Sequence, residues 1–191
     1  MLDLLSLHKQ ILSAHLNQGD TAVDFTMGNG NDTLFLAQTV GANGHVYAFD
    51  IQEQALLQTK DRLELNGVAD RVTLIKDSHH FAENYITKKF DAGVFNLGYL
   101  PGGDKTLTTK CETTRCAVLS ALKLMKDGGI LLIAVYPGHA EGEREGDMLH
   151  ALFSELDRRQ YCAAVLKIVN SPDSPYFFTV EKGRSKSRSG E

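Results

Sequence analysis

The sequence TAVDFTMGNGNDT at residues 21–33 constrains the fold of this chain more than any other stretch. Its first residues are mostly apolar, which is typical of a buried strand. Gly28 and Gly30 then permit backbone angles and close approaches that a Cβ atom would forbid. Asp32 and Thr33 suit the first turn of a helix. The stretch therefore predicts a strand, a glycine turn and a helix start, in the order found where α/β proteins bind nucleosides.

An acidic residue ends the next predicted strand. That strand, HVYAFD, covers residues 45–50 and closes with Asp50, 20 residues after Gly30. In nucleoside-binding α/β proteins, the backbone of the glycine turn and a carboxylate at this position hold the ligand, and the carboxylate binds the ribose hydroxyls. We therefore expect Asp50 to accept hydrogen bonds from a ribose, with Gln52 close behind it.

Departures from the dinucleotide-binding pattern indicate which nucleoside is bound. That pattern needs a small third residue where this chain has Thr33, and it seats a pyrophosphate at the helix start. Asp24 and Asp32 instead surround the turn with negative charge. S-adenosylmethionine (SAM) carries a sulfonium, an amino group and no phosphate, so it is the predicted cofactor. An NAD oxidoreductase and a turn that merely connects two elements stay open as alternatives.

The composition fits a single enzyme domain in the cytoplasm. A chain of 191 residues that is 42% hydrophobic can bury one full core, and no apolar run is long enough to cross a membrane. The N-terminal segment is typical of an amphipathic helix rather than a signal peptide. The three cysteines lack CxxC or metal-ligand spacing and are expected to be reduced thiols. They are Cys111, Cys116 and Cys162.

One domain is expected to span residues 1–183. The basic tail at 184–191 is predicted to be disordered, with a phosphate-contacting arm as the alternative. The net charge of −4 argues against binding nucleic acid by bulk electrostatics, but it permits a local RNA-binding patch. The adjacent His79 and His80 have no third ligand nearby in the sequence, so no metal is expected. The oligomeric state is left open, with a homodimer among the expected forms.

Predicted strands and helices alternate along the chain. The strands are expected at 21–25, 45–50, 71–77, 91–97, 130–137, 162–170 and 176–183. The helices are expected within 1–16, 32–41, 53–67, 108–127 and 144–160, with a short amphipathic segment at 79–89. Apolar strands joined by helical crossovers indicate a parallel sheet covered on both faces. The last two strands follow each other after a short turn, so they are expected to form an antiparallel hairpin.

This arrangement resembles the class I SAM-dependent methyltransferase fold, a Rossmann-like α/β fold. Its mostly parallel seven-stranded sheet has the order 3-2-1-4-5-7-6, with the last strand antiparallel and helices on both faces. The motifs DFTMGNGNDT, GYLPGGDK and YPGHAEG are similar to those of the MnmM (YtqB-like) family, labelled as rRNA methylases. The resemblance covers about residues 1–183. It implies methylation of the aminomethyl group on a 2-thiouridine at the tRNA wobble position, with the tRNA anticodon loop as partner.

In the predicted fold, the cofactor-binding turns follow the carboxyl ends of the strands. Asp24 and the turn backbone are expected to hold the methionine part of SAM. Asn29 and Asn31 offer amide donors and acceptors to its amino and carboxylate groups. The residues after the third strand are expected at the adenine, although a turn with a helix cap is the alternative. The turn residues are Gly28, Asn29, Gly30 and Asn31, and the adenine candidates are Asp77, Ser78 and His79.

The chemistry is expected at residues 96–99, Asn-Leu-Gly-Tyr, after the fourth strand. This stretch resembles the N-P-P-Y motif of amino-methyltransferases, although Leu97 and Gly98 replace both prolines. The side-chain carbonyl of Asn96 and the backbone carbonyl of Leu97 are expected to accept the two N–H groups of an amine. Tyr99 is expected to stack on a base. A turn with a core tyrosine stays open as the alternative.

His139, in YPGH after the fifth strand, is predicted to face the same cleft. Its role stays open between a base, a substrate contact and a structural hydrogen bond. Asp104 either caps the following segment or contacts the substrate amine. The nearest cations that could hold anticodon bases and phosphates are Lys105, Lys110 and Arg115.

Several functions stay open beside wobble-uridine methylation. The rRNA methylase label suggests an rRNA substrate, and the net negative charge with no added RNA-binding domain favours a small-molecule N- or O-methyltransferase. A catalytically silent SAM-binding scaffold is the alternative that is not an enzyme. Asp50, Asp77 and Asn96 argue against this last reading, because each matches a role in binding or catalysis.

Overall fold

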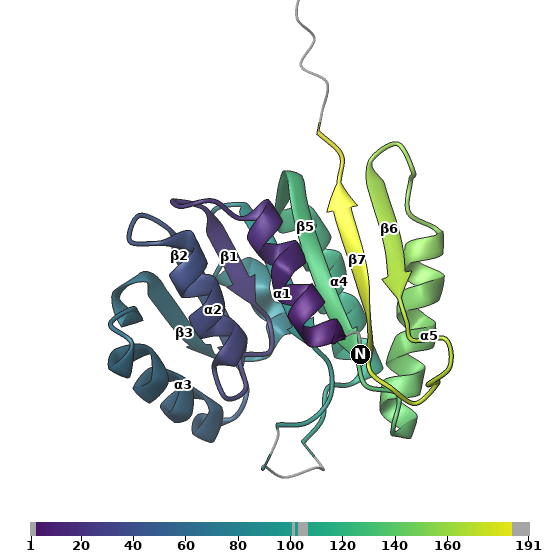
Figure 1. The fold of residues 1–191 in the computed structure, drawn as a ribbon, viewed down its shortest axis with the longest axis horizontal. Helices are drawn as coiled ribbons and strands as arrows, with labels where there is room; N and C mark the ends of the chain where they lie inside the picture. Colours follow the sequence, from purple (N-terminus) through teal and green to yellow (C-terminus); the bar gives the residue numbers. More distant parts are fainter. Residues whose placement is uncertain (1–2, 101, 103–106, 185–191) are drawn as a thin grey trace, which may run out of the picture.

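The computed structural model describes residues 3–100, 102 and 107–184. Its seven strands form one sheet in the order β3-β2-β1-β4-β5-β7-β6 (Figure 1). Strands β1 to β5 pair in parallel, whereas β7 is antiparallel to both β5 and β6. The predicted fold class and strand order are confirmed.

The elements follow the predicted alternation of strands and helices. The strands are β1 Thr21–Asp24, β2 His45–Asp50, β3 Val72–Lys76, β4 Phe90–Asn96, β5 Met125–Val135, β6 Tyr161–Leu166 and β7 Tyr176–Lys182. The α-helices are α1 Leu4–His15, α2 Asn31–Val40, α3 Glu53–Leu65, α4 Cys111–Leu124 and α5 Ala140–Ser154. Two short 3₁₀ helices, η1 Ala69–Arg71 and η2 His79–Asn84, flank β3.

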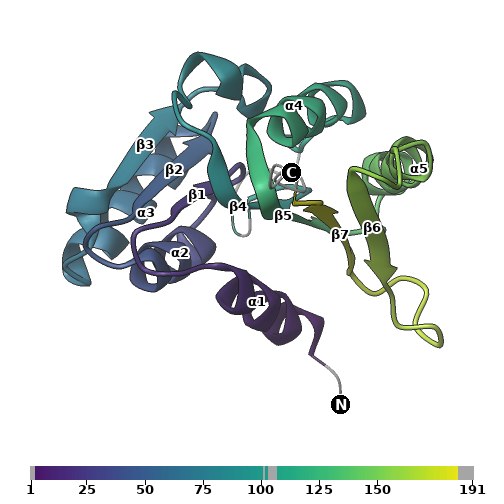
Figure 2. The same cartoon turned by 90° about the horizontal axis from the view of Figure 1, so that it is seen from above.

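Helices cover both faces of the sheet, with α1, α2 and α3 on one face and α4 and α5 on the other (Figure 2). Under α4, the aromatic rings of Phe25, Phe49 and Phe95 stack beneath the ends of β1, β2 and β4. The ring centroids of Phe25 and Phe95 are 4.2 Å apart. Because all three side chains are fully buried, this stack fixes the strand ends from which the candidate site is built.

The boundary between α4 and β5 differs from the sequence prediction. The helix was expected to continue to Gly128 and Gly129, but it ends at Leu124, and Met125 already pairs with Phe90 of β4. The pairing then shifts register, and Gly128 adopts a φ of +81°. The two glycines therefore lie in an irregular part of β5 rather than ending the helix, as glycines at bulges often do.

The two chain ends differ in how much the structure describes. The predicted amphipathic N-terminal helix is α1, whose Leu12 is fully buried against the sheet. At the other end, β7 closes at Lys182, and all of the predicted tail except Arg184 lies outside the described residues. Among the described residues, no helix is long and apolar enough to span a bilayer.

Candidate functional site

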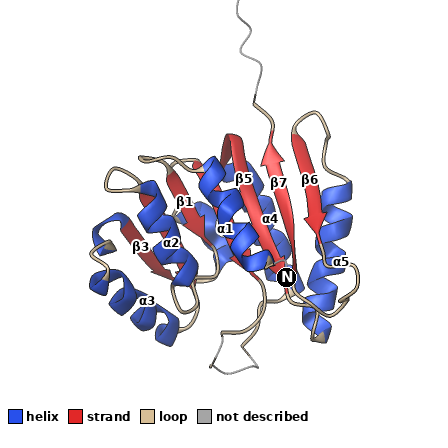
Figure 3. Ribbon diagram, viewed as in Figure 1, coloured by secondary structure: helices blue, strands red, loops and turns tan. Residues whose placement is uncertain are grey.

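The candidate site lies at the carboxyl ends of the parallel strands, where the loops after β1, β2, β3, β4 and β5 meet. In Figure 3 this edge of the sheet lies at the bottom of the view, where tan loops connect the strands to the helices. Strand order reverses direction between β1 and β4, and open α/β sheets bind ligands at such a switch point. The sheet therefore brings together loops that are far apart in the sequence.

The glycine turn after β1 has the predicted geometry. Gly28 and Gly30 adopt positive φ angles of +49° and +74°. A Cβ atom on Gly30 would lie 2.7 Å from the Thr59 hydroxyl of α3, so any side chain there would displace the helix. That hydroxyl donates to the Gly28 carbonyl at 3.1 Å, and Arg62 Nε donates to the Asn29 carbonyl at 2.8 Å. Helix α3 thus braces the backbone of the turn.

Asp24 lies behind the glycine turn rather than at its surface. Its side chain is 1% exposed, and its carboxylate accepts hydrogen bonds from the Thr33 hydroxyl and the Thr26 backbone N–H. Burial, aided by the nearby negative charge of Asp32, raises the pKa of Asp24 to about 7. In this geometry Asp24 ties β1 to the first turn of α2.

Asp50 lies at the end of β2 and faces the glycine turn. One carboxylate oxygen accepts from the Gly28 N–H at 3.1 Å and the other from the Gln52 N–H at 2.9 Å. A carboxylate can accept about four hydrogen bonds, so Asp50 keeps acceptor capacity for an outside donor. Burial raises the pKa of the Asp50 carboxyl above its ordinary value, and the backbone N–H groups of Gln52, Gly28 and Ile51 oppose this rise.

The three adenine candidates after β3 differ in exposure. The Asp77 carboxylate accepts from the Ser78 N–H at 2.7 Å and from the Tyr85 hydroxyl at 2.6 Å. His79 is 8% exposed, and its Nδ1 lies 3.1 Å from the Phe25 carbonyl, so this nitrogen donates to that oxygen. Burial lowers the pKa of His79 to about 4, so its ring is neutral at physiological pH.

Asn96 is oriented by Asp32, which the sequence indicated as part of a helix start and as a negative charge beside the turn, but not as a partner of Asn96. Its side-chain Nδ2 donates to Asp32 Oδ2 at 2.8 Å, and its backbone N–H donates to the Thr26 hydroxyl at 2.7 Å. Asp32 also lies 3.6 Å from Lys9 of α1. With the amide nitrogen engaged, the Asn96 carbonyl oxygen is left as a hydrogen-bond acceptor.

A buried acid fastens the loop after β4. The Gly98 N–H donates to the Thr109 hydroxyl at 2.8 Å, and that hydroxyl donates to Glu145 of α5 at 2.9 Å. The Thr114 hydroxyl donates to the other Glu145 oxygen at 2.5 Å. Glu145 is fully buried, and its burial raises the pKa of the carboxyl. The sequence shows Glu145 within a charged helix, and nothing in that pattern marks it as interior.

His139 and Tyr99 come together, as the sequence predicted for residues of one cleft. Their ring centroids are 6.0 Å apart, and Tyr99 is 40% exposed. His139 caps α5, because its Nδ1 accepts from the Gly142 N–H at 3.0 Å. In the neutral ring the proton is therefore on Nε2, a buried atom that has no hydrogen-bond partner among the described residues.

The remaining candidate residues, which were predicted to contact the substrate, do not form part of the site described above. Asp104 and Lys105 lie outside the described residues, whereas Lys110 and Arg115 are exposed at the start of α4. In the described part of the chain, no group of three or more His, Cys, Asp or Glu side chains could hold a metal ion.

The sheet order and the site at its switch point define a class I SAM-dependent methyltransferase. Residues 46–182 match the model of the family described as "Putative rRNA methylase", and the chain belongs to this family. A Clostridium thermocellum crystal structure with the same description has a TM-score of 0.93 and 37% identity, covering 95% of this chain and 98% of that one. A Streptococcus mutans methyltransferase in complex with SAH has a TM-score of 0.86 and 36% identity, covering 95% and 99%.

A curated relative carries a more specific name. The Arabidopsis thaliana protein "tRNA (mnm(5)s(2)U34)-methyltransferase, chloroplastic" is 34% identical in an alignment of 171 positions that covers 84% of this chain and 62% of the relative. The chain therefore spans about three-fifths of the length of that relative.

Proposed function

We propose that this protein is a SAM-dependent RNA N-methyltransferase. Its proposed acceptor is the aminomethyl nitrogen of 5-aminomethyl-2-thiouridine at the tRNA wobble position. The observation that carries this proposal is the bond from Asn96 Nδ2 to Asp32, which leaves the Asn96 carbonyl to accept an N–H of an amine. The name of the Arabidopsis thaliana relative supports the wobble uridine. An rRNA acceptor is the second candidate, supported by the family description.

The residues of the glycine turn and of β2 fit SAM. The Gly28–Asn31 turn brings backbone close to a ligand, and Gly30 leaves no room for a side chain. The acids around the turn suit a cationic sulfonium and an ammonium group rather than a phosphate. We assign the methionine part to this turn, with Asn29 and Asn31 as its polar contacts, and the ribose to the remaining lone pairs of Asp50, beside Gln52.

We assign the adenine to the region after β3. Asp77 and Ser78 provide polar groups at this edge, and the buried ring of His79 supports the strand ends from below. Asp24 is proposed to act on the ligand through the glycine turn. Its side chain is buried, and its two carboxylate oxygens accept hydrogen bonds from Thr26 and Thr33. It is a positioning residue in this scheme.

Bound SAM would supply an electrophilic methyl group. The acceptor nitrogen needs a free lone pair aligned with that methyl, so the side-chain carbonyl of Asn96 and the backbone carbonyl of Leu97 are proposed to accept its N–H groups and fix its direction. The nitrogen must be unprotonated before transfer and loses one proton afterwards. Tyr99 is proposed to stack on a base. His139 is proposed to position this loop or the substrate, because its Nδ1 is occupied and its Nε2 is a donor.

The experiment that tests this function compares acceptors. The protein is incubated with SAM and three RNAs: tRNA carrying the aminomethyl precursor, unmodified transcribed tRNA and an rRNA fragment. Mass spectrometry of the digested nucleosides should find one added methyl group on the precursor nucleoside alone. Equal methylation of unmodified tRNA would contradict the aminomethyl acceptor, and methylation of the rRNA fragment alone would favour the second candidate.

A cytoplasmic location, a homodimer and the anticodon loop as partner are part of the same proposal.

A further inference from the structure

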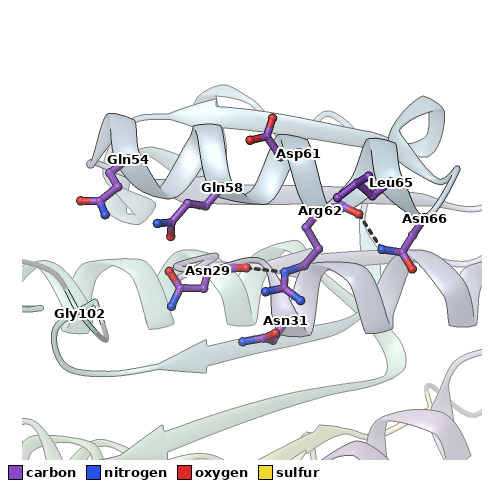
Figure 4. A pocket seen from close by; sticks show the side chains of 9 residues that line it. All are labelled: Asn29, Asn31, Gln54, Gln58, Asp61, Arg62, Leu65, Asn66 and Gly102. Carbon is purple, nitrogen blue, oxygen red and sulfur yellow. Dashed lines mark hydrogen bonds between the residues drawn. The ribbon is translucent and has the colours of Figure 1, made fainter.

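A pocket lies beside the glycine turn, between this turn and α3. It has a volume of about 620 Å³ and is formed between α3 and the loop that carries Asn29 and Asn31 (Figure 4). Pockets of about 300–1,000 Å³ hold small organic ligands or parts of larger ones. The pocket shares Asn29 and Asn31 with the proposed methionine contacts, but Asp50, Asp77 and Asn96 are not among its described lining residues, so a ligand held by Gln54 and Gln58 would lie beside the cofactor.

Neutral amide side chains dominate the lining of this pocket. Gln54 and Gln58 project from α3 toward the loop that carries Asn29 and Asn31 (Figure 4). An amide presents a donor and an acceptor side by side, which matches the paired groups on the edge of a nucleobase. Among the described residues, the side-chain amides of Asn31, Gln54 and Gln58 have no hydrogen-bond partner, so they are available to a ligand.

The other lining residues suit the rest of a nucleotide. Arg62 uses Nε to hold the Asn29 carbonyl, which leaves its terminal nitrogens for a phosphate or for stacking on a base. Leu65 is 88% exposed and offers an apolar surface to the face of a base. The charge of Arg62 is balanced by Asp61, so the pocket has no strong field of either sign. This balance favours an uncharged heterocycle over a polyanion or a cation.

Two consecutive residues link the pocket to the proposed acceptor position. Asn31 lines the pocket, and the following residue, Asp32, holds the amide of Asn96. The intervening loop is rigid, because Thr59 and Arg62 both brace its carbonyls from α3. An RNA strand with its reactive base at Asn96 would therefore place a neighbouring nucleotide on the side of the loop that carries Asn31.

We infer that this pocket binds a nucleobase of the RNA substrate that flanks the methylated nucleotide. The inference rests on the proposed function, because it needs an RNA acceptor. Single-stranded bases are read by contacts to their edges and by stacking, and the amides, Arg62 and Leu65 supply both kinds of contact. The pocket thus recognises the base next to the methylated nucleotide, while the site at Asn96 selects the nucleotide that is methylated.

The test uses the full chain with an anticodon-loop hairpin that carries the aminomethyl nucleoside. The variant is Gln54→Ala/Gln58→Ala, and the matched control is Gln38→Ala, which removes an exposed amide from α2 outside the pocket. Hairpin affinity is measured by fluorescence anisotropy, SAM affinity by calorimetry, and turnover with both the hairpin and the free aminomethyl nucleoside. Loss of the two amides should weaken hairpin binding about tenfold, the scale of a lost base-edge contact. SAM affinity and turnover of the free nucleoside should match those of the control.

Hairpins with a single abasic position then locate the recognised base. Removing that base should weaken binding to the wild-type protein but not to the double variant, because both changes delete the same contact. Unchanged hairpin binding by the variant would overturn the inference, and a parallel loss of SAM affinity would place the pocket in the cofactor site instead. A wild-type protein that does not methylate the hairpin at all would contradict the proposed function rather than the pocket alone.

Discussion

The side-chain amide of Asn96 donates to the carboxylate of Asp32 at 2.8 Å, across 64 positions of the sequence. This bond decides which end of the Asn96 amide is available to the substrate. The amide nitrogen is bound to Asp32, so only the carbonyl oxygen can form a hydrogen bond with the amine that is to be methylated. Asp32 is 15% exposed and begins α2, so its own position is fixed by the helix. The orientation of the proposed catalytic amide therefore depends on the same turn that is proposed to hold the cofactor.

Asp32→Ala should lower turnover measured at saturating SAM. Without the carboxylate, the Asn96 amide is free to rotate and to present its nitrogen instead of its oxygen. Loss of a hydrogen bond to a charged group costs about 1.5–3 kcal/mol, which corresponds to roughly a 10- to 150-fold drop in kcat if it is felt in the transition state. Asp32→Asn should recover much of this loss, since its amide oxygen can still accept from Asn96. Steady-state kinetics on both variants measure the difference.

The double variant Asp32→Ala/Asn96→Ala serves as the control for this prediction. If Asp32 acts through Asn96, the double variant should be no slower than Asn96→Ala alone. Additive losses would mean that Asp32 has a separate role, and equal losses in Asp32→Asn and Asp32→Ala would show that charge rather than orientation matters.

Asp50→Ala should weaken SAM binding strongly without preventing folding. The change removes the proposed charge-assisted contacts to the ribose and also the acceptor of the Gly28 N–H. Hydrogen bonds to charged groups contribute about 1.5–3 kcal/mol, so a roughly 10- to 100-fold loss of affinity is expected. Calorimetry measures the affinity, and circular dichroism checks the fold. Asp70→Ala, which removes an exposed acid elsewhere, should bind SAM normally. Normal binding by a folded Asp50→Ala would remove Asp50 from the site.

The fold and the glycine turn could be predicted from the sequence because their signals are local. Alternating apolar strands and helices fix the sheet class, and Gly28 and Gly30 mark a turn that needs positive φ angles. The end of α4 could not be predicted, because the pairing of Met125 with Phe90 overrides the glycines that follow. Long-range pairing decides between two locally acceptable structures at this point.

Residues that act on the site through other residues were harder to predict. Asp32 has the pattern of an ordinary helix start, and its bond to Asn96 exists only once β1 and β4 lie side by side. Glu145 lies in a charged stretch of sequence, yet it is buried against Thr109 and Thr114. Periodicity assigns charged residues to the surface, so a buried acid with hydroxyl partners needs tertiary structure to be found.

The buried carboxyl of Asp24 should make stability fall as the pH rises. Burial raises its pKa from 3.8 to about 7, so the folded protein binds a proton that the unfolded chain releases. The contribution to stability is complete below the unfolded pKa and is lost as the pH rises toward about 7. Asp24→Asn, which cannot ionise, should lose less stability over this interval.

Urea unfolding at a series of pH values tests this prediction. His79 has a pKa lowered to about 4, so it acts with the opposite sign and costs stability as the pH falls below its ordinary value of 6.5. His79 is present in both wild type and Asp24→Asn. The difference between their free energies of unfolding at each pH therefore gives the contribution of the Asp24 carboxyl alone. Asp70→Asn provides the exposed control. Identical pH profiles for wild type and Asp24→Asn would show that the Asp24 pKa is not raised.

Lys110→Ala/Arg115→Ala should weaken RNA binding and reduce its dependence on salt. Both side chains are exposed near the start of α4, which follows the loop that carries Asn96 and Tyr99. Each phosphate contact on a single strand contributes a slope of about −0.7 to the plot of log K against log salt concentration, so losing two should reduce the slope by about 1.4. Binding titrations of the anticodon hairpin at several salt concentrations give the slope. Lys88→Ala/Lys89→Ala, which removes two exposed cations just before β4, at the other end of the strand from this loop, should leave it unchanged. SAM affinity should be the same in both double variants, because neither pair touches the glycine turn or Asp50. An unchanged salt slope in Lys110→Ala/Arg115→Ala would exclude this end of α4 from the RNA-binding surface.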